Sequence, residues 1–278
     1  MIELPEAVAL SRQIQETILG KKIVSVKVAV SPHKFAWYYK DPQMYEQIIL
    51  NKTITESKSY GGFVEIQVEN TVLLFNDGVG LRYHSELDPK PMRHQLLVEF
   101  DDGSALSASV QMYGGLWCYK KGDFHNDYLT VAQEKPSPLS LDFDRSYFDN
   151  ILSNDNQKLS LKALLATEQR IPGLGNGVLQ DVLFNAGLHP KRKTNTLKKS
   201  ECDKLYNSLK GTIYQMTQMG GRDTEKDLFS CKGGYKTILS ANTLKYPCPV
   251  CGSGLIREAY LGGNIYYCPV CQPLEGGK

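Results

Sequence analysis

The spacing of apolar residues changes halfway along the chain of 278 residues, which predicts a β-rich part followed by a helical part. We expect a helix over residues 3–20, because apolar residues recur there at helical spacing and Gly20 can end it. Short β-like runs separated by turn signals come next, at residues 22–30, 53–57, 63–68, 71–75, 95–100 and 105–110. A leading helix followed by antiparallel strands predicts an N-terminal β-sandwich over residues 1–132.

Helical patterns dominate after residues 133–145, a segment with two prolines that we interpret as a linker. They predict helices at residues 147–152, 159–166, 176–186 and 199–219. We therefore assign residues 146–240 to a helical domain and residues 241–278 to a separate C-terminal module. The predicted fold class is α+β with several domains.

Four cysteines define the C-terminal module. They form two Cys-x-x-Cys motifs separated by sixteen residues: Cys248, Cys251, Cys268 and Cys271. Four thiolates on two tight turns suit one tetrahedral Zn²⁺, and the β-type residues between them predict a hairpin, so together they indicate a zinc ribbon. Such a closed site makes the ion structural and not catalytic. Two disulfides, or four unrelated buried cysteines, are the alternatives.

Composition limits the function classes only loosely. The chain is 41% hydrophobic and 22% charged, with a net charge of +2, which is ordinary for a globular protein. It contains no apolar run long enough to span a membrane and no signal-peptide pattern, and its cysteines suit a reducing compartment, so we expect a cytoplasmic protein. Residues 191–210 carry seven basic and two acidic side chains, which indicates either a nucleic-acid surface or a solvated helix face.

A glycine-rich turn precedes one of the predicted helices. Gly173 and Gly175 stand directly before the helix that begins at Asn176. Exposed backbone N–H groups and the helix dipole would make this turn an anion site suited to a phosphate. A plain turn is the alternative interpretation.

The order of short motifs carries more information than any one of them. They are Met1–Glu6, Leu161–Leu165, Gly173–Asn176, Ala186–Pro190, Gly220–Asp223, Lys226–Phe229 and the cysteine motifs. This order resembles the formamidopyrimidine-DNA glycosylase / endonuclease VIII family of base-excision repair enzymes. The resemblance covers nearly the whole chain and is strongest at residues 3–6 and 159–271. It implies a β-sandwich, a helix–two-turn–helix domain and a zinc ribbon in a monomer that acts on damaged double-stranded DNA, associated with the nucleoid if the protein is bacterial.

The resemblance also implies roles for particular residues. Glu3 matches the general acid/base, although a favourable charge at a helix N-terminus is the alternative, and Glu6 and the amine of Met1 complete the candidate catalytic set. The implied DNA contacts are the phosphate ligands Lys162, Gly175 and Asn176, the wedge Gln111, Met112 and Tyr113 with Val79 beside it, the base-covering loop with Arg222 and Thr224, and Asn264 at the ribbon tip. For Met112 and Tyr113, packing in the core is the alternative.

Three departures from the family pattern fall on the chemistry. Ile2 stands where the family has a proline, and its bulk is expected to hinder removal of Met1, so that the free amine is primary and displaced by one residue. Gly62 stands at the position of a strand lysine, with Lys58 the nearest substitute, and Gly263 stands at the position of a ribbon arginine. We therefore expect weak or absent cleavage at abasic sites.

Three functions remain open at this point. The first is a DNA N-glycosylase with altered chemistry, in which Glu3 activates water or positions the Met1 amine. The second is a catalytically inactive protein that binds damaged DNA, and the third is an unrelated zinc-ribbon scaffold. Trp37 and Trp117 are expected in the core, and Cys118, Cys202 and Cys231 are expected to be buried or inert thiols.

Overall fold

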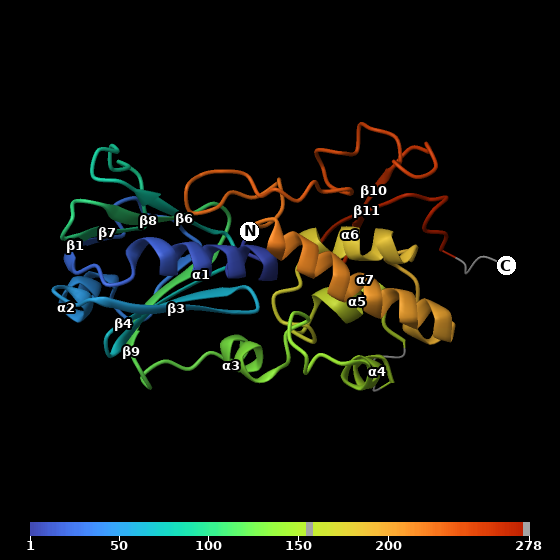
Figure 1. Ribbon diagram of the computed structural model, residues 1–278, viewed down its shortest axis with the longest axis horizontal. Coiled ribbons are helices and arrows are strands. Elements are labelled where there is room, and N and C mark those ends of the chain that lie inside the picture. The colour runs from blue at the N-terminus through green and yellow to red at the C-terminus, as the bar shows by residue number, and fades with distance from the viewer. Residues whose placement is uncertain (154–157, 275–278) are drawn as a thin grey trace. The chain divides into compact units, whose positions relative to one another are not determined.

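The structure is a computed structural model and describes residues 1–153 and 158–274. Its chain forms two compact units (Figure 1). The first contains Met1–Gln133 and, after a long excursion of the chain, Gly220–Gly234. The second contains Glu134–Met219 and the residues from Tyr235 on. Within the described ranges, no helix combines the length and the apolar character needed to cross a bilayer.

The first unit is a β-sandwich with one long helix, α1 (Leu4–Ile18), packed against it. One sheet has the order β1-β7-β8-β6, formed by Ile23–Val28, Leu96–Phe100, Ala105–Val110 and Val79–His84. The other has the order β2-β9-β5-β4-β3, formed by Ala36–Trp37, Gly114–Lys120, Thr71–Asn76, Phe63–Val68 and Ile54–Tyr60. All neighbouring strands pair antiparallel except β2 and β9. Short helices at Pro42–Met44 (η1), Tyr45–Ile49 (α2) and Asp127–Glu134 (α3) complete the elements of this region.

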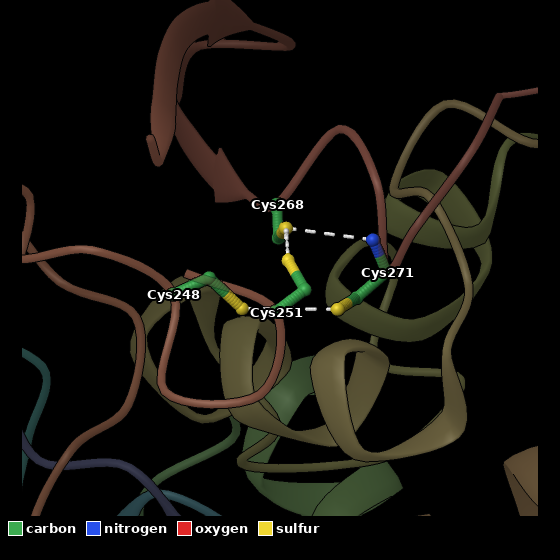
Figure 2. A group of neighbouring side chains, drawn as sticks. All are labelled: Cys248, Cys251, Cys268 and Cys271. Carbon is green, nitrogen blue, oxygen red and sulfur yellow. Dashed lines mark hydrogen bonds between the residues drawn. The ribbon is translucent and has the colours of Figure 1, made fainter. Parts of the chain in front are cut away.

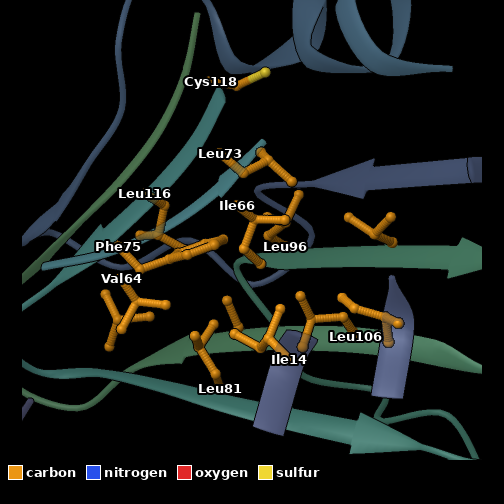
Figure 3. Packing of buried hydrophobic residues seen from close by; sticks show 14 of the residues in the cluster. Ile14, Val64, Ile66, Leu73, Phe75, Leu81, Leu96, Leu106, Leu116 and Cys118 are labelled. Carbon is orange, nitrogen blue, oxygen red and sulfur yellow. The ribbon is translucent and has the colours of Figure 1, made fainter. Parts of the chain in front are cut away.

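The core of the first unit lies between the two sheets and α1. Figure 3 shows Ile14 of α1 among Val64 and Phe75 of one sheet and Leu81 and Leu106 of the other. Burying an aliphatic or aromatic side chain of this size contributes about 1.5–3 kcal/mol, so this cluster is the main source of stability in the unit. The candidate catalytic residues Glu3 and Glu6 lie at the start of α1, which packs into this core.

The segment Gly220–Gly234 returns to this sandwich through one apolar anchor. Leu228 is fully buried in the core cluster. Its carbonyl accepts from the N–H of Tyr83 on β6 (2.8 Å), and its own N–H donates to Oε1 of Gln13 on α1 (3.0 Å). The segment is therefore held between a sheet edge and a helix. A single leucine among polar residues gave no periodic signal from which this return could be predicted.

The second unit is helical and ends in a β-hairpin. Its helices are α4 (Arg145–Ser153), α5 (Leu161–Ala166), α6 (Asn176–Ala186), the short η2 (Thr194–Thr196) and α7 (Lys199–Gln218). The hairpin pairs β10 (Ile256–Tyr260) with β11 (Gly263–Tyr267). The buried carboxylate of Asp181 on α6 accepts from the N–H groups of Ile238 and Leu239, both at 2.8 Å. This contact fixes the chain that leads into the hairpin.

The predicted fold class is confirmed, and the differences lie in individual elements. The first helix, the six predicted strands and the four predicted helices are all present, and α6 has the predicted bounds. Strands β6 and β9 were not predicted because Gly80, Gly114 and Gly115 interrupt their patterns. The structure also places residues 220–234 with the sandwich, although the sequence assigned them to the helical domain 146–240.

Candidate active site and DNA-binding surface

Three charged side chains are buried together at the start of α1. Glu3 precedes the helix and Glu6 lies in its first turn, and Pro5 suits this turn because its missing N–H would have no partner there. The N–H of Glu3 donates to Oε2 of Glu6 at 3.2 Å. Arg222 approaches from residues 220–234, and all three side chains are at most 5% exposed. A buried charge of this kind is tolerated only when it is paired.

Arg222 supplies the pairing for both carboxylates. Its Nε and Nη2 donate to the two oxygens of Glu6 at 3.0 and 2.9 Å, and its Nη1 lies 3.3 Å from Oε1 of Glu3. Its backbone N–H also donates to Glu6, at 3.0 Å. Burial by itself would lower the pKa of Arg222, but the carboxylates of Glu3 and Glu6 raise it above its usual value. The guanidinium therefore stays charged and fixes both carboxylates.

Glycines allow the chain to bring Arg222 into this position. Gly220 and Gly221 have φ values of +75° and +98°, a region that side chains disfavour. A Cβ on Gly233 would lie 2.3 Å from the backbone of Gly221, so the two strands of this loop can approach only without side chains. The guanidinium of Arg222 is enclosed by the protein in this structure, and its predicted role in DNA binding stays a prediction.

The amino group of Met1 lies at a pocket of about 180 Å³ in the same unit. It forms an ion pair of 2.5 Å with Oε2 of Glu225. Ile2 is buried in the core cluster, and its N–H donates to the carbonyl of Asp77 at 2.6 Å, so Met1 alone projects from the packed region. Burial raises the pKa of Asp77, and the nearby N-terminal charge partly opposes that shift.

The pocket joins several of the predicted residues. Its walls come from the N-terminus, from β6 and its preceding turn, and from the segment after Arg222: Met1, Ile2, Glu6, Leu10, Gly78, Val79, Gly80, Leu81, Arg82, Gln111, Thr224, Glu225 and Lys226. Glu6, Gln111 and Thr224 were expected at the site. Glu225 was not, and its only signal in the sequence was its place in the motif between residues 220 and 229. Glu3 is not among the residues that line the pocket. It contacts Arg222 and Glu6, and Glu6 does line it.

The predicted wedge lies in the turn between β8 and β9. Met112 is 64% exposed and Tyr113 is 36% exposed, so the core alternative is wrong for both. Val79, which was expected beside them, is buried in the core at the start of β6. Trp37 was expected in the core but is 44% exposed, and its ring packs against that of Tyr113. The rings therefore project from the sheet edge while Val79 supports it from inside.

In the second unit, the predicted phosphate ligands contact the ribbon hairpin. Nζ of Lys162 donates to the carbonyl of Tyr260, and Nδ2 of Asn176 donates to the carbonyl of Asn264 at 2.7 Å. Burial lowers the pKa of Lys162. Gly175 precedes α6 with an extended backbone, as expected for the residue that starts this helix.

Gln180, one turn further along α6, was not predicted as part of this arrangement. Its side chain donates to the carbonyl of Asn264 at 3.2 Å and accepts from the N–H of Tyr266 at 3.0 Å. It therefore binds the backbone of β11 in the manner of a neighbouring strand. The hairpin tip, Lys162 and the start of α6 form one surface as a result.

The four cysteines of the ribbon converge on one point (Figure 2). Their sulfurs lie within 4.8 Å of one another, with 3.7 Å between those of Cys248 and Cys271 and 3.4 Å between those of Cys251 and Cys268. These distances exclude disulfides, which need about 2.05 Å. A tetrahedral ion with metal–sulfur bonds of about 2.3 Å would place its sulfurs about 3.8 Å apart, so the four side chains fit such an ion.

Known proteins match the chain over almost its full length. The profile of the formamidopyrimidine-DNA glycosylase H2TH domain matches residues 135–227. A formamidopyrimidine-DNA glycosylase of Bacillus cereus is 27% identical, covering 98% of this chain and 99% of that protein. The chain is similar to formamidopyrimidine-DNA glycosylases over almost its full length. The corresponding protein of Mycoplasma mobile is 25% identical over 99% of this chain and 100% of its own.

Solved structures of the family share this fold. The MutM (Fpg) protein of Thermus thermophilus superposes with a TM-score of 0.79 at 24% identity, covering 99% of this chain and 100% of its own. The Lactococcus lactis Fpg in complex with DNA containing an abasic site gives 0.82 at 21% identity, over 98% and 99% of the two chains. The chain therefore has the fold of these Fpg structures.

The departures from the glycosylase-family pattern occupy defined places. Gly62 lies in the turn between β3 and β4. Lys58 lies on β3, where the nearby carboxylate of Glu56 raises its pKa through an exposed ion pair of 2.8 Å. Gly263 begins β11, and a Cβ there would meet Nζ of Lys162 at 3.4 Å. Lys58 does not line the Met1 pocket, so it does not stand in for a lysine at Gly62 there.

Proposed function

We propose that this protein is a DNA glycosylase that removes damaged bases from double-stranded DNA in base-excision repair. The match of its helical region to the formamidopyrimidine-DNA glycosylase H2TH domain and its full-length similarity to proteins named formamidopyrimidine-DNA glycosylase support this assignment. Solved neighbours with the same fold include Lactococcus lactis Fpg in complexes with abasic-site DNA and with DNA containing N7-benzyl-Fapy-dG. The lesion that this chain accepts follows from the shape of its own pocket.

One observation carries the enzymatic part of the proposal. A pocket holds the Met1 amine and a Glu6 carboxylate that is fixed by Arg222, beside the apolar core cluster of the unit. Burying three charges together costs free energy that a well-packed apolar cluster would not, which supports a purpose beyond stability. Positioned carboxylates and a positioned amine are the groups needed to break a glycosidic bond by acid–base or covalent catalysis.

Two chemical routes use these groups. In the covalent route, the unprotonated Met1 amine attacks C1′ of the sugar and the bond from C1′ to the base breaks, with the amine proton passing to the departing base. Opening of the sugar ring then gives a Schiff base, which water hydrolyses to the abasic aldehyde and the free amine. In the hydrolytic route, Glu3 or Glu6 accepts a proton from water as the water attacks C1′ and the bond from C1′ to the base breaks; the departing base takes up a proton in return.

The two routes differ in what the structure already positions. Glu225 holds the amine at the pocket, which favours the covalent route. Glu3 is not among the residues that line the pocket in this structure, whereas Glu6 is, so Glu6 is the carboxylate nearer to the pocket for the hydrolytic route. Glu3 contacts Arg222 and Glu6. We propose weak or absent cleavage at the abasic site, because the amine is primary and Gly62 supplies no lysine.

The second unit supplies DNA contacts in this proposal. Lys162 and Asn176, with the backbone at Gly175, bind phosphates at the start of α6, where the helix dipole favours an anion. Asn264 acts at the hairpin tip. In this structure the same donors bind backbone carbonyls of the hairpin, so a phosphate would exchange for a neutral acceptor. From the first unit, Gln111, Met112 and Tyr113 act as the wedge that fills the space of the displaced base.

We further propose that the four ribbon cysteines hold one Zn²⁺. When bound, the ion supplies structure only, because four protein ligands leave no open position. The cysteines themselves connect the two ends of the hairpin and thereby fix Gly263 and Asn264 against α6.

The decisive experiment is a base-release assay on duplexes that carry oxidised purines, oxidised pyrimidines or alkylated bases. The protein must have its native N-terminus, confirmed by mass spectrometry, because a tag would block the Met1 amine. Borohydride trapping separates the routes, since it captures a Schiff base but not a hydrolytic intermediate. We expect base release from at least one lesion and its loss in Glu6→Gln.

A protein that binds damaged DNA without catalysis is the second candidate. The observation that favours it is charge neutralisation: Arg222 pairs with Glu3 and Glu6, and Glu225 pairs with the Met1 amine. This candidate predicts lesion-selective, salt-dependent binding with no base release from any duplex. Base release above the level of the Glu6→Gln variant excludes it.

A further inference from the structure

Two aromatic rings are exposed together at one edge of the first unit. The rings of Trp37 and Tyr113 have their centroids 5.6 Å apart with an interplanar angle of 31°, and the side chains are 44% and 36% exposed. Met112, the residue before Tyr113, is 64% exposed. Single exposed apolar residues are common, but two rings packed on each other with a methionine beside them form a continuous apolar surface.

The backbone holds this pair in place. Trp37 lies on β2, which pairs with β9 directly after Tyr113, with Trp37 opposite Gly115. The carbonyl of Tyr113 accepts from the N–H of Gly78 at 2.9 Å. A Cβ on Gly78 would lie 2.5 Å from that carbonyl oxygen, so only glycine permits this contact. Trp37 is thus carried by a paired strand, and Tyr113 lies in the turn directly before β9, where Gly78 binds its carbonyl.

Trp117, the other tryptophan of the chain, packs in the core and serves as a comparison for Trp37. Trp117 is 8% exposed and packs against Phe63 and Phe124 within a buried cluster. Trp37 belongs to no such cluster among the described residues, and its contact with Tyr113 leaves nearly half of its surface open. Core packing therefore does not account for a tryptophan at residue 37.

Two lysines lie in the same chain segment as Trp37. Nζ of Lys34 lies 5.4 Å from the ring of Phe35, and Nζ of Lys40 lies 4.9 Å from the ring of Tyr39. Residues 31–40 contain these two lysines and no acid. Aromatic side chains interleaved with cations are the usual surface for an unstacked nucleobase and its flanking phosphates. Gln111, two residues before Tyr113, lines the Met1 pocket, so this surface adjoins the candidate active site.

We propose that Trp37 and Tyr113 form a stacking platform for an unstacked nucleobase of the lesion-containing duplex. The inference rests on the proposed function for the identity of the ligand as damaged DNA. It adds Trp37 as a second ring behind the wedge. A base that has lost its partner stacks on the rings, while Lys34 and Lys40 face the backbone of its strand.

The tryptophan content of the chain makes this platform directly measurable. The chain has two tryptophans, and one of them is buried, so iodide-quenchable emission reports Trp37. We expect a duplex containing a tetrahydrofuran abasic-site analogue to quench this emission and to protect it from iodide. An undamaged duplex should do so much less, because its bases remain stacked. In Trp37→Phe the quenching disappears, since only Trp117 remains.

Affinity gives an independent readout on the same full-length protein. Stacking on one aromatic ring contributes enough that Trp37→Ala should weaken binding to the abasic duplex by about 5- to 150-fold. Trp37→Phe should retain most of the affinity because phenylalanine still stacks. Tyr128→Ala is the matched control, since Tyr128 is 59% exposed on α3 and should leave the affinity unchanged.

Three results would overturn the platform. The first is unaltered Trp37 emission at saturating abasic duplex, and the second is an unchanged affinity in Trp37→Ala. The third is a change in sedimentation of Trp37→Ala with DNA binding intact, which would assign the surface to a second copy of the chain. Failure of the glycosylase proposal would look different from failure of the platform. In that case the abasic duplex would still quench Trp37, but no lesion would release a base.

Discussion

The buried charges at the start of α1 allow a quantitative prediction for Arg222→Met. Methionine fills a similar volume but leaves Glu3 and Glu6 buried without a countercharge. Two well-formed charged hydrogen bonds to Glu6, at 3.0 and 2.9 Å, are lost, together with the longer contact of 3.3 Å to Glu3. The N–H of residue 222 keeps its own bond to Glu6 in the variant.

The expected loss follows from these contacts. Hydrogen bonds to charged groups contribute about 1.5–3 kcal/mol each, and breaking a buried ion pair from one side costs about 3–5 kcal/mol. Removing the arginine also removes the cost of keeping its guanidinium dehydrated, so the ion-pair range applies and the hydrogen bonds are not added to it. We expect Arg222→Met to reduce the free energy of unfolding by about 3–5 kcal/mol, a large share of the about 5–15 kcal/mol typical of a domain.

The assay is urea unfolding followed by tryptophan fluorescence and circular dichroism. Hydrogen exchange of the amides in residues 220–234 accompanies it, because the loss can appear as local opening of that segment. Arg12→Met is the matched control: Arg12 is an exposed arginine on the same helix, and its replacement should change stability by less than about 0.5 kcal/mol.

A double variant tests the cause of the effect. In Arg222→Met with Glu6→Leu, one buried carboxylate is removed together with its partner, so part of the lost stability should return. The reasoning is refuted if Arg222→Met costs less than about 1 kcal/mol without faster exchange in residues 220–234, well under the cost expected for a broken buried pair. It is also refuted if the double variant is no more stable than the single one.

Three further predictions follow from contacts at the Met1 pocket and the ribbon. Glu225→Gln should change stability by at most about 1 kcal/mol, since its ion pair with the Met1 amine is part-exposed. Borohydride trapping through Met1 should nevertheless fall several-fold. Unchanged trapping would exclude Glu225 from positioning the amine. Gly263→Arg should tighten lesion-duplex binding and steepen its salt dependence by about one phosphate contact. The site has room for the side chain, because a Cβ there meets only side-chain ends at 3.4 Å or more. Gly263→Gln is the uncharged control, and equal affinities of the two variants would mean that the tip does not reach DNA. In native protein, iodoacetamide should label exposed Cys231 but not Cys118, because burial raises the pKa of Cys118 to about 12. Addition of a chelator should make the four ribbon thiols reactive as well, which mass spectrometry would detect as four further labels. Labelling of those four thiols without a chelator would argue against the metal.

Cys231 was predicted to be a buried or an inert thiol; it is exposed, so burial is wrong and the second alternative stays a prediction. A lone cysteine gives no periodic pattern, so its surroundings cannot be predicted from its neighbours. The same holds for Trp37, for which residue type favoured the core. In both cases the side chain's environment is set by strands or turns that are brought there by distant parts of the chain.

Local physics did determine much of the protein from sequence alone. Helix α6 has its predicted bounds because Gly175 precedes it and Gly187, with φ of +68°, ends it in a left-handed conformation. The cysteine cluster follows from two short motifs whose spacing fits one tetrahedral ion. Residues 111–113 directly follow β8, as the strand predicted over residues 105–110 implied. Their role as a wedge came from the family resemblance and stays a prediction.

Only the tertiary structure decided which of these residues meet. Arg222 reaches Glu6 across 216 positions of sequence because Leu228 returns its segment to the sandwich core. Lys162 binds the carbonyl of Tyr260, 98 positions away, because Gln180 on α6 binds the backbone of the hairpin at Asn264 and Tyr266. Sequence spacing specifies local turns and helix faces, whereas such long-range pairs depend on how whole elements pack, and packing is a property of the folded chain.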